Sequence, residues 1–352
     1  MKGGRVFQLD RQPRKPLASV SLDLDNEWSY LKTHGDATWS SFPSYLDVVV
    51  PRVLDFLSQR NLRITFFIVG QDAVLEGNIA ALRSIADAGH EIGNHSFHHE
   101  PWLQRYSDEA IECEIALAEE HIERATGVRP VGFRGPGFSF SPTVLQTLCR
   151  RGYRYDASTF PTFIGPLARA YYFMKSKLPR AELRRRSALF GVLADGLRPN
   201  KSYRWQLDGG ELLEIPVTTM PGLRLPIHVS YLVYLSMFSR SLARLYFRIA
   251  LALCRLTRTQ PSLLLHPLDF LGCEDNKTLA FFPGMNVPRE TKLAVVSDAI
   301  DMLATSHEIV TVREHAAVAL SSARQVPVPT ARKYQSSHNV HAHIRQAGTT
   351  TP

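Results

Sequence analysis

The histidine-rich stretch at 92–100 reads IGNHSFHHE and places His95 and His99 four residues apart. If the chain turns into a helix here, side chains at i and i+4 lie on one face, so both imidazoles reach one metal ion. Neutral imidazole is a common ligand for Zn²⁺ and its neighbours in the transition series. A strand-like run at 90–92 precedes the pair, and Asn94 suits the N-cap of such a helix. The stretch therefore predicts a metal site that follows a strand.

Length and composition are those of an ordinary globular chain. The 352 residues, 44% of them apolar and 21% charged, suggest one large α/β domain with decorations, or at most two domains. The cysteines are widely scattered and form no Cys-x-x-Cys pair, which favours reduced core residues over a zinc ribbon or a disulfide framework. They are Cys113, Cys149, Cys254 and Cys273.

Both ends of the chain read as flexible tails. Residues 1–16, MKGGRVFQLDRQPRKP, hold no apolar signal core, which predicts a cytoplasmic location. Residues 323–352 are polar without a periodic pattern, and we expect them to be disordered. No uncharged apolar run reaches the length of about 18 residues that a membrane span needs, so we predict no transmembrane helix.

Strand-like and helix-like segments alternate through 17–322, which predicts a mainly parallel sheet of the α/β class. Ionisable side chains follow five of the expected strands. In a closed β/α barrel the carboxyl ends of the strands meet at one mouth, so these side chains predict a single barrel active site. A doubly wound open sheet is the alternative, but no Gly-x-Gly-x-x-Gly follows the first strand. The side chains are Asp23 and Asp25, His95 and His99, Arg134, Asp156, and His266.

Five short motifs, in this order, resemble those of the polysaccharide deacetylase family, also called NodB-homology or carbohydrate esterase 4. They are SLDLD at 21–25, NHSFHH at 94–99, FRGPG at 133–137, YRYDAS at 153–158 and LLHP at 264–267. The resemblance implies a distorted (β/α)7 barrel over 17–322, with a basic helical insertion region at 162–258 that contains one barrel strand. The Asp-x-Asp form of the first motif also resembles the branch that deformylates undecaprenyl phosphate-linked 4-formamido-arabinose.

The resemblance implies a metal-dependent hydrolase that removes an N-acyl group, acetyl or formyl, from an amino sugar. An Asp and the two histidines would bind Zn²⁺, or else Co²⁺, Mn²⁺ or Ni²⁺, another Asp would be the general base, and His266 the general acid. The family usually has two adjacent aspartates, whereas Asp23 and Asp25 stand two apart. Because residues two apart in a strand point the same way, both can face the barrel mouth. We assign Asp23 as base and Asp25 as metal ligand, with Glu27 as the rival ligand if the strand breaks at Leu24.

Two further residues of these motifs have expected roles in catalysis. Arg134 is expected to hold Asp23 ionised through a charge-assisted hydrogen bond, and its alternative is an ordinary ion pair. Asp156 is expected to hold His266 in one tautomer or to contact the sugar, and its alternative is to cap a loop.

Substrate contacts are expected at three positions. Trp28 is assigned to the pocket wall, with stacking on a sugar ring as the second possibility. Pro136 and Gly137 lie in the third motif, which implies contact with the substrate. The family usually has an aromatic residue before the last Gly of this motif, whereas here Gly135 and Gly137 flank Pro136.

The net charge of +8 is unevenly placed. Between Thr162 and Trp205 there are ten basic residues against Glu182 and Asp195, a surplus as large as that of the whole chain. Such a segment indicates nucleic acid, an anionic membrane or a phosphorylated substrate, or else a solvated helical face. No recognisable nucleic-acid motif accompanies the charge, so we expect no nucleic-acid partner.

A second basic feature lies in the apolar stretch 227–258. Arg240, Arg244 and Arg248 stand at i, i+4 and i+8, which makes a narrow basic row on an apolar helix. This pattern suits peripheral contact with an anionic membrane, and its alternative is a helix packed on the barrel with solvated arginines. The hypothesis is a lipid-linked or phosphate-linked glycan as substrate.

Three functions compete at this point. The first is a metal-dependent N-deacylase acting on an amino sugar. The second keeps the fold but hydrolyses a small cyclic or linear amide, and it needs no basic insertion. The third is a non-catalytic relative that binds glycan or lipid, which is disfavoured because each proposed base, acid and ligand position holds a competent residue.

Overall fold

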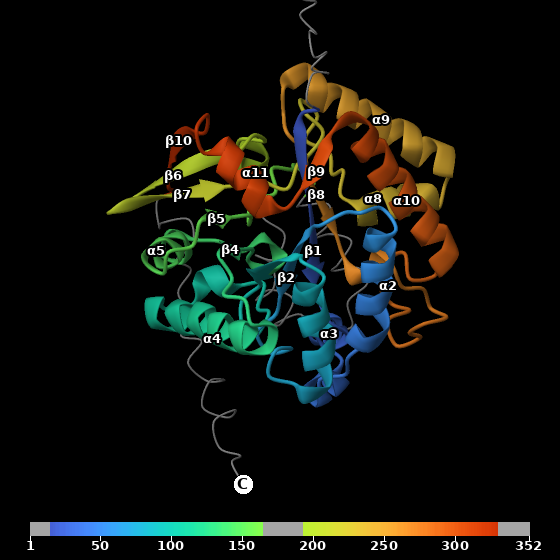
Figure 1. Cartoon of the computed structure of the whole chain (residues 1–352), viewed down its shortest axis with the longest axis horizontal. Coiled ribbons are helices and arrows are strands. Elements are labelled where there is room, and N and C mark those ends of the chain that lie inside the picture. The colour runs from blue at the N-terminus through green and yellow to red at the C-terminus, as the bar shows by residue number, and fades with distance from the viewer. Residues whose placement is uncertain (1–14, 165–192, 330–352) are drawn as a thin grey trace, which may run out of the picture.

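The computed structural model describes residues 15–164 and 193–329 (Figure 1). Most of the expected N-terminal tail (1–16) lies outside the described residues. So do residues 165–192 of the basic insertion and residues 330–352 of the expected C-terminal tail.

The described strands form one sheet in the order β10-β6-β7-β5-β4-β3-β2-β1-β8, with β9 also pairing with β1. All pairs are parallel except the hairpin of β6 and β7. The predicted α/β class with a mainly parallel sheet is therefore confirmed. The strands are β1 (Leu17–Leu24), β2 (Thr65–Ile68), β3 (Glu91–Asn94), β4 (Gly132–Phe133), β5 (Tyr155–Asp156), β6 (Tyr203–Leu207), β7 (Gly210–Glu214), β8 (Ser262–Leu265), β9 (Glu308–Val310) and β10 (Arg324–Pro327).

Helices surround the strands (Figure 1). Neighbours in sequence from α2 to α5 pack side by side along the outside of the sheet, and α8, α9 and α10 form a second group. The α-helices are α1 (Glu27–His34), α2 (Leu46–Ser58), α3 (Glu76–Asp87), α4 (Asp108–Thr126), α5 (Pro142–Arg150), α8 (Val229–Ser236), α9 (Arg240–Thr257), α10 (Arg289–Ser306) and α11 (Val312–Ala319). Short 3-10 turns are η1 (Ala37–Ser41), η2 (Leu103–Arg105), η3 (Pro136–Phe138), η5 (Leu193–Leu197) and η6 (Pro267–Asp269).

Two glycines let aromatic rings cross the inner face of the sheet. Gly93 in β3 is paired with Phe67, and a Cβ atom there would lie 2.5 Å from the Phe67 ring. Gly132 in β4 is paired with Tyr155, and a Cβ atom there would lie 2.0 Å from it. The two rings consequently meet, with centroids 6.4 Å apart, although β2 and β5 are not adjacent. Glycine at these positions therefore permits close approach across the interior.

Helix α11 covers the amino ends of the strands. Its first backbone amide, at Val312, donates to the Thr65 hydroxyl at the start of β2, and Arg313 N donates to Glu91 at the start of β3. Its apolar face joins the same buried cluster as Phe67 and Tyr155. The opposite, carboxyl ends of the strands are left for the polar motifs.

The barrel is not closed by a strand ladder within the described residues. After β7 the chain passes β8, where Thr218 N donates to Ser262 O at 3.0 Å and the Thr218 hydroxyl accepts from Ser262 N at 2.8 Å. These two bonds join the segment that follows β7 to the edge strand β8, so the curled sheet is bridged here by two hydrogen bonds and not by a continuous ladder.

Two segments differ from the expectation. Residues 29–44, expected as a loop, contain most of α1 and all of η1; Asn26 caps α1, and Gly35 ends it in the left-handed conformation. The tail expected to begin at 323 begins with β10, which pairs with β6. β10 is too short to show a clear alternation of apolar and polar residues, and its partner strand is remote in the chain. None of the helices in 15–164 and 193–329 has the length and apolar character to cross a membrane.

Candidate active site

Asp25, His95 and His99 lie together at the carboxyl ends of the strands. Asp25 follows β1 and the histidines follow β3. The Asp25 Oδ1 atom is 2.9 Å from His99 Nε2 and 3.3 Å from His95 Nε2, and the three candidate ligand atoms lie within 4.8 Å of one another. Glu27, the rival ligand, begins α1 and is not part of this group among the described residues.

The two histidines do not lie on a helix, which contradicts the expected i, i+4 helical geometry. The chain after β3 is an irregular turn in which Ser96 and His99 have φ values of 60° and 52°. Asn94 is not a helix cap, because its Oδ1 accepts the N–H of Ser96 within this turn. Two left-handed non-glycine residues carry strain, so the surrounding structure has to impose the conformation.

Glu114 of α4 imposes the shape of this turn. It is buried, and its Oε2 accepts the backbone N–H groups of Phe97 at 3.1 Å and His98 at 3.0 Å, while Oε1 contacts His98 Nδ1. Sequence reasoning missed this residue. The signal was a carboxylate on the buried stripe of α4, between Ile111 and Ala118, where an apolar residue is expected.

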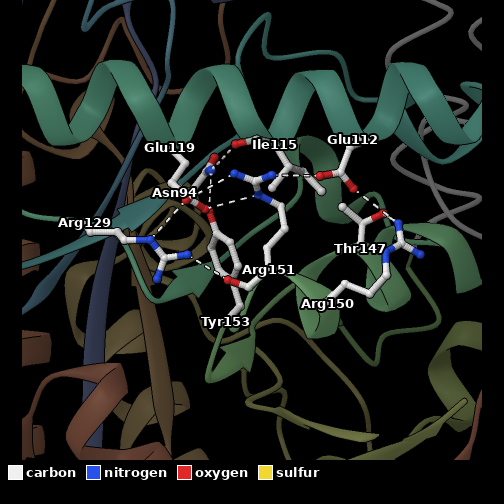
Figure 2. A network of polar contacts seen from close by, with 9 residues as sticks. All are labelled: Asn94, Glu112, Ile115, Glu119, Arg129, Thr147, Arg150, Arg151 and Tyr153. Carbon is white, nitrogen blue, oxygen red and sulfur yellow. Dashed lines mark hydrogen bonds and ion pairs between the residues drawn. The ribbon is translucent and has the colours of Figure 1, made fainter. Parts of the chain in front are cut away.

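Asn94 connects the same turn to an ion-pair network between α4 and α5 (Figure 2). Its Nδ2 donates to Tyr153 Oη at 2.8 Å and to Ile115 O at 3.1 Å. Figure 2 shows Arg151 reaching both Glu112 and Glu119 of α4 from the end of α5, at 2.8 and 3.2 Å. The network holds α4, and with it Glu114, against the end of β3, which the histidine turn follows.

The three candidate ligands fit a divalent cation. His95 Nδ1 lies 2.6 Å from Arg134 O, a carbonyl that can only accept, so in the neutral ring the Nε2 lone pair faces Asp25. Asp25 Oδ1 is buried, and within 15–164 and 193–329 its near neighbours are the Nε2 atoms of the two histidines. Burial alone would raise the pKa of Asp25, but His99 and His95 hold it well below the ordinary value. An imidazole–imidazole–carboxylate set suits Zn²⁺, Co²⁺, Mn²⁺ or Ni²⁺ and leaves further positions open.

Asp23 is held by Arg134. The guanidinium is fully buried, and its Nη1 donates to Asp23 Oδ1 at 2.7 Å and to the Ser21 hydroxyl at 2.8 Å. Its Nε donates to Ala157 O at 2.9 Å. The Arg134–Asp23 contact that the sequence predicted is present, and it aims one carboxylate beside the candidate metal ligands.

His266 stands at the end of β8, next to β1. The register pairs Leu22 with Leu265, so Asp23 and His266 are the next residues along their strands. The His266 ring contacts the Ser230 hydroxyl of α8, with Nδ1 and Oγ 3.1 Å apart, and its backbone N–H donates to Asp269 Oδ2 at 2.8 Å. The ring is partly exposed.

Asp156 does not hold His266, and it is too deeply buried to contact a sugar, which corrects both expected roles. Its neighbours are Ser158, whose hydroxyl it accepts, and Glu214, its partner in register on β7. Glu214 accepts from Thr159 N, Thr159 Oγ1 and Trp205 Nε1. Burial, and next the charge of Glu214, raise the pKa of Asp156 well above its ordinary value. Asp156 and Glu214 therefore form a buried carboxyl pair in which the protonated form of Asp156 is favoured.

Of the three residues expected to contact the substrate, two are buried and one is exposed. Trp28 is 1% exposed, and its Nε1 donates to Asp72 Oδ1 at 2.8 Å. Its ring packs edge-on against His99, so it supports this candidate metal ligand and is too buried to stack on a sugar ring. Pro136 is also buried. Gly137 is exposed and has φ 59°, with Pro101 where its Cβ would point.

An aromatic wall that sequence reasoning missed adjoins His266. The rings of Phe138 and Phe160 are stacked with centroids 4.8 Å apart, and Phe160 packs edge-on against His228, whose centroid is 6.3 Å from that of His266. Burial lowers the pKa of His228 to about 3, and the nearby His266 contributes in the same direction. These partly exposed rings form an apolar side beside the candidate general acid.

The basic row on α9 is partly engaged in ion pairs with α10. Arg240 donates to Asp298 of α10 at 2.6 Å, and Arg244 lies 3.9 Å from the same carboxylate. Arg240 is therefore in an ion pair on the protein surface, whereas Arg248 is exposed. Beside the row, exposed apolar residues form a stripe on one side of α9, which consists of Leu242, Leu245, Ile249 and Leu256.

Comparisons with known proteins agree with this architecture. Residues 32–155 match the family model described as polysaccharide deacetylase. A crystal structure of a Mycobacterium smegmatis protein assigned to the polysaccharide deacetylases superposes with a TM-score of 0.59 over 93% of this chain and 96% of that one, at 20% identity. At this identity the likeness establishes the fold.

Curated relatives match over shorter stretches. A peptidoglycan-N-acetylglucosamine deacetylase of Bacillus cereus is 37% identical over 86 residues, 24% of this chain and 30% of the relative. The peptidoglycan-N-acetylmuramic acid deacetylase PdaA of Bacillus subtilis is 33% identical over 111 residues, 31% of this chain and 41% of the relative. A chitooligosaccharide deacetylase of Azorhizobium caulinodans is 29% identical over 163 residues, 46% of this chain and 74% of the relative.

Residues 32–155 thus match the polysaccharide deacetylase family, which is the family that the five motifs resemble, and the fold is that of a structure assigned to it. The matched region of this chain spans less than half the length of the first two of these relatives.

Replacing Glu114 should loosen the histidine turn and weaken metal binding. In Glu114→Ala the amides of Phe97 and His98 lose their acceptor, and we expect the dissociation constant for Zn²⁺ to rise about 10- to 100-fold, as for other residues that orient metal ligands. Competition with a chromophoric chelator measures it. Glu123→Ala, an exposed position on the same helix, should leave the constant unchanged; equal affinity of Glu114→Ala and wild type would refute the role of Glu114.

The buried carboxyl pair should make stability fall as pH rises. Because the pKa of Asp156 is raised in the folded state, the folded protein keeps a proton that the unfolded chain releases above about pH 4, and stability declines from there upward. Asp156→Asn keeps a donor toward Glu214 but does not ionise. Its Tm relative to wild type should increase between pH 5 and pH 8, while exposed Asp208→Asn should show no such trend. A relative Tm that decreases would contradict the pairing.

Proposed function

We propose that the protein is a metal-dependent hydrolase that removes an N-acyl group from an amino sugar. The observation that carries the proposal is the grouping of Asp25, His95 and His99 beside the Arg134–Asp23 ion pair, at one end of the sheet. A site that only binds metal would not need a second carboxylate, Asp23, held in place beside the ligands without being one of them. The second carboxylate is what amide hydrolysis adds.

Each step of amide hydrolysis has a residue available for it. A divalent ion bound at this site would supply Lewis acidity and a water with lowered pKa. Asp23, fixed by Arg134, would accept the proton of the attacking water, and His266 would deliver a proton to the leaving amine. Because Arg134 is buried and also bonded to Ser21 and Ala157, the Asp23 carboxylate would keep one orientation through the reaction.

The names of the relatives favour acetyl as the leaving acyl group. Those compared here are deacetylases of peptidoglycan or chitooligosaccharide. Formyl remains the second candidate, on the resemblance of the Asp-x-Asp motif to the deformylase branch. The aromatic wall next to His266 supports a sugar ring as the bound group, because aromatic faces pack well against the apolar faces of pyranose rings.

Acetate and formate release tests the reaction. Wild-type protein, metal-loaded, should release acetate from N-acetylglucosamine oligomers or peptidoglycan fragments, and chelation should abolish it. Asp23→Asn should lose the general base and at least about 10²-fold in kcat, yet bind Zn²⁺ as tightly as wild type. Release that survives both chelation and Asp23→Asn would refute the mechanism, and full metal binding without release from any N-acyl sugar would favour the small-amide alternative.

We further propose that the amino sugar is lipid- or phosphate-linked and that the protein contacts an anionic membrane, with Arg248 and the apolar stripe of α9 as the contact surface. Support comes from charge and exposure: Leu242, Leu245 and Ile249 are about half exposed, beside exposed arginines. Arg240 is left out of this surface because Asp298 binds it. A location at the cytoplasmic side of the membrane is part of the same proposal.

Vesicle binding tests the membrane surface. Wild type should sediment with phosphatidylglycerol vesicles and not with phosphatidylcholine vesicles, and Leu242→Ser/Leu245→Ser/Ile249→Ser should bind several-fold less. Val318→Ser, an equally exposed apolar position on α11, is the matched control. Failure of the wild type to bind anionic vesicles would remove the membrane proposal and leave the deacylase proposal unaffected.

A further inference from the structure

The candidate general acid has a hydrogen-bond partner that lies outside the five motifs. The ring nitrogen Nδ1 of His266 is 3.1 Å from the hydroxyl of Ser230, which lies in the first turn of α8. The orientation of the imidazole therefore depends on a residue 36 positions away in the chain.

Ser230 itself adjoins a buried carboxyl group. Asp269 is 2% exposed and accepts the backbone N–H of His266 through Oδ2 at 2.8 Å, and its own backbone N–H donates to His266 O at 3.0 Å. Burial raises the pKa of Asp269 above its ordinary value, and the charge of His266 and the hydrogen bonds from His266 N and Ser230 offset part of that rise. Serine, histidine and aspartate thus form one connected group.

The Asp269 loop is held from the other side by a buried lysine. Lys292 of α10 is 1% exposed, and its Nζ donates to Leu268 O at 2.8 Å and to Leu271 O at 2.6 Å, on both sides of Asp269. Its positive charge also lowers the pKa of Asp269. A group built on α8, η6 and α10 is rigid enough to keep a ring in one orientation.

The buried carboxyl group of Asp269 favours one order of donors in this group. A hydroxyl has one hydrogen, and an ionised carboxylate only accepts. When the Ser230 hydrogen is given to Asp269, the Ser230 oxygen is left to accept, and its remaining partner is the Nδ1–H of His266. The other nitrogen, Nε2, then takes and gives up the proton that a general acid transfers.

We propose that Ser230, backed by Asp269, is the positioning residue of the general acid: it fixes His266 as the Nδ1–H tautomer and keeps Nε2 for proton transfer. The kinetic consequence of this inference rests on the proposed function. The tautomer of His266 can be tested whether or not the protein is a deacylase. Ser230 takes the role that Asp156 was expected to have, since Asp156 is bonded to Ser158 and paired with Glu214.

The first experiment reads the tautomer directly. Nitrogen-15 NMR of the metal-loaded chain with labelled histidine, with the His266 signals identified by their loss in His266→Gln, should show a protonated Nδ1 and an unprotonated Nε2 in the neutral ring. Ser230→Ala should move these signals toward a mixture of tautomers. A protonated Nε2 in the wild type would overturn the proposal, whether or not the protein proves to be a deacylase.

The second experiment reads the consequence for catalysis. Ser230→Ala should lower kcat for acyl release by about tenfold or more, which is a part of the roughly 10²- to 10⁴-fold that general acid catalysis contributes, with KM changed less than about twofold. Ser230→Thr keeps the hydroxyl and should recover most of kcat. Ser236→Ala removes another hydroxyl of α8, one bonded to Val233 O, and should have no effect. An unchanged kcat in Ser230→Ala, or failure of Thr to rescue it, would overturn the positioning role; an inactive wild type would instead overturn the proposed function and leave the NMR test standing.

Discussion

The buried guanidinium of Arg134 is the interaction on which the rest of the site depends. It is fully inaccessible, and it bonds Asp23 and Ser21 of β1 on one side and Ala157, just beyond β5, on the other. A charge in such a place is tolerated only when it is paired and hydrogen-bonded, and removing one partner of a buried ion pair costs on the order of 3–5 kcal/mol. The pair therefore fixes the distance between strands that are not neighbours in the sheet.

The same residue links the ion pair to the candidate metal site. Its backbone carbonyl lies against His95 Nδ1, and its guanidinium lies 4.4 Å above the Phe67 ring, which fills the interior below. Base and metal ligands consequently share one support. A change in the packing under Phe67 would reach both at once, which explains why the curled inner face, with Gly93 and Gly132 making room for aromatic rings, matters for chemistry at the strand ends.

The strand ends and their ionisable residues were predictable because parallel strands bring their carboxyl ends to one edge wherever the connections run. Asp23, Asp25 and His266 needed no more than this rule and the motif order. The irregular turn that carries His95 and His99 was not predictable, since it is shaped by Glu114, 16 residues beyond His98 and on a different element.

The hydrogen-bond partners of Asp156 and His266 were not predictable for a related reason. Which carboxylate faces Asp156 depends on β7 being the neighbour of β5, with a stretch of more than fifty residues between them. Likewise Ser230 meets His266 only once α8 has packed against the end of β8. A motif gives the residue types of a site, whereas the hydrogen-bond partners that orient them come from segments whose sequence carries no sign of the role.

The central claim, that Asp25, His95 and His99 hold one catalytic ion, is tested most directly by counting metal. Native mass spectrometry of the chelator-treated protein titrated with Zn²⁺ should show one tightly bound ion per chain, lost in His95→Gln and in Asp25→Asn and retained in His98→Gln, whose side chain points to Glu114. One tightly bound ion in both His95→Gln and Asp25→Asn would place the metal elsewhere and contradict the account.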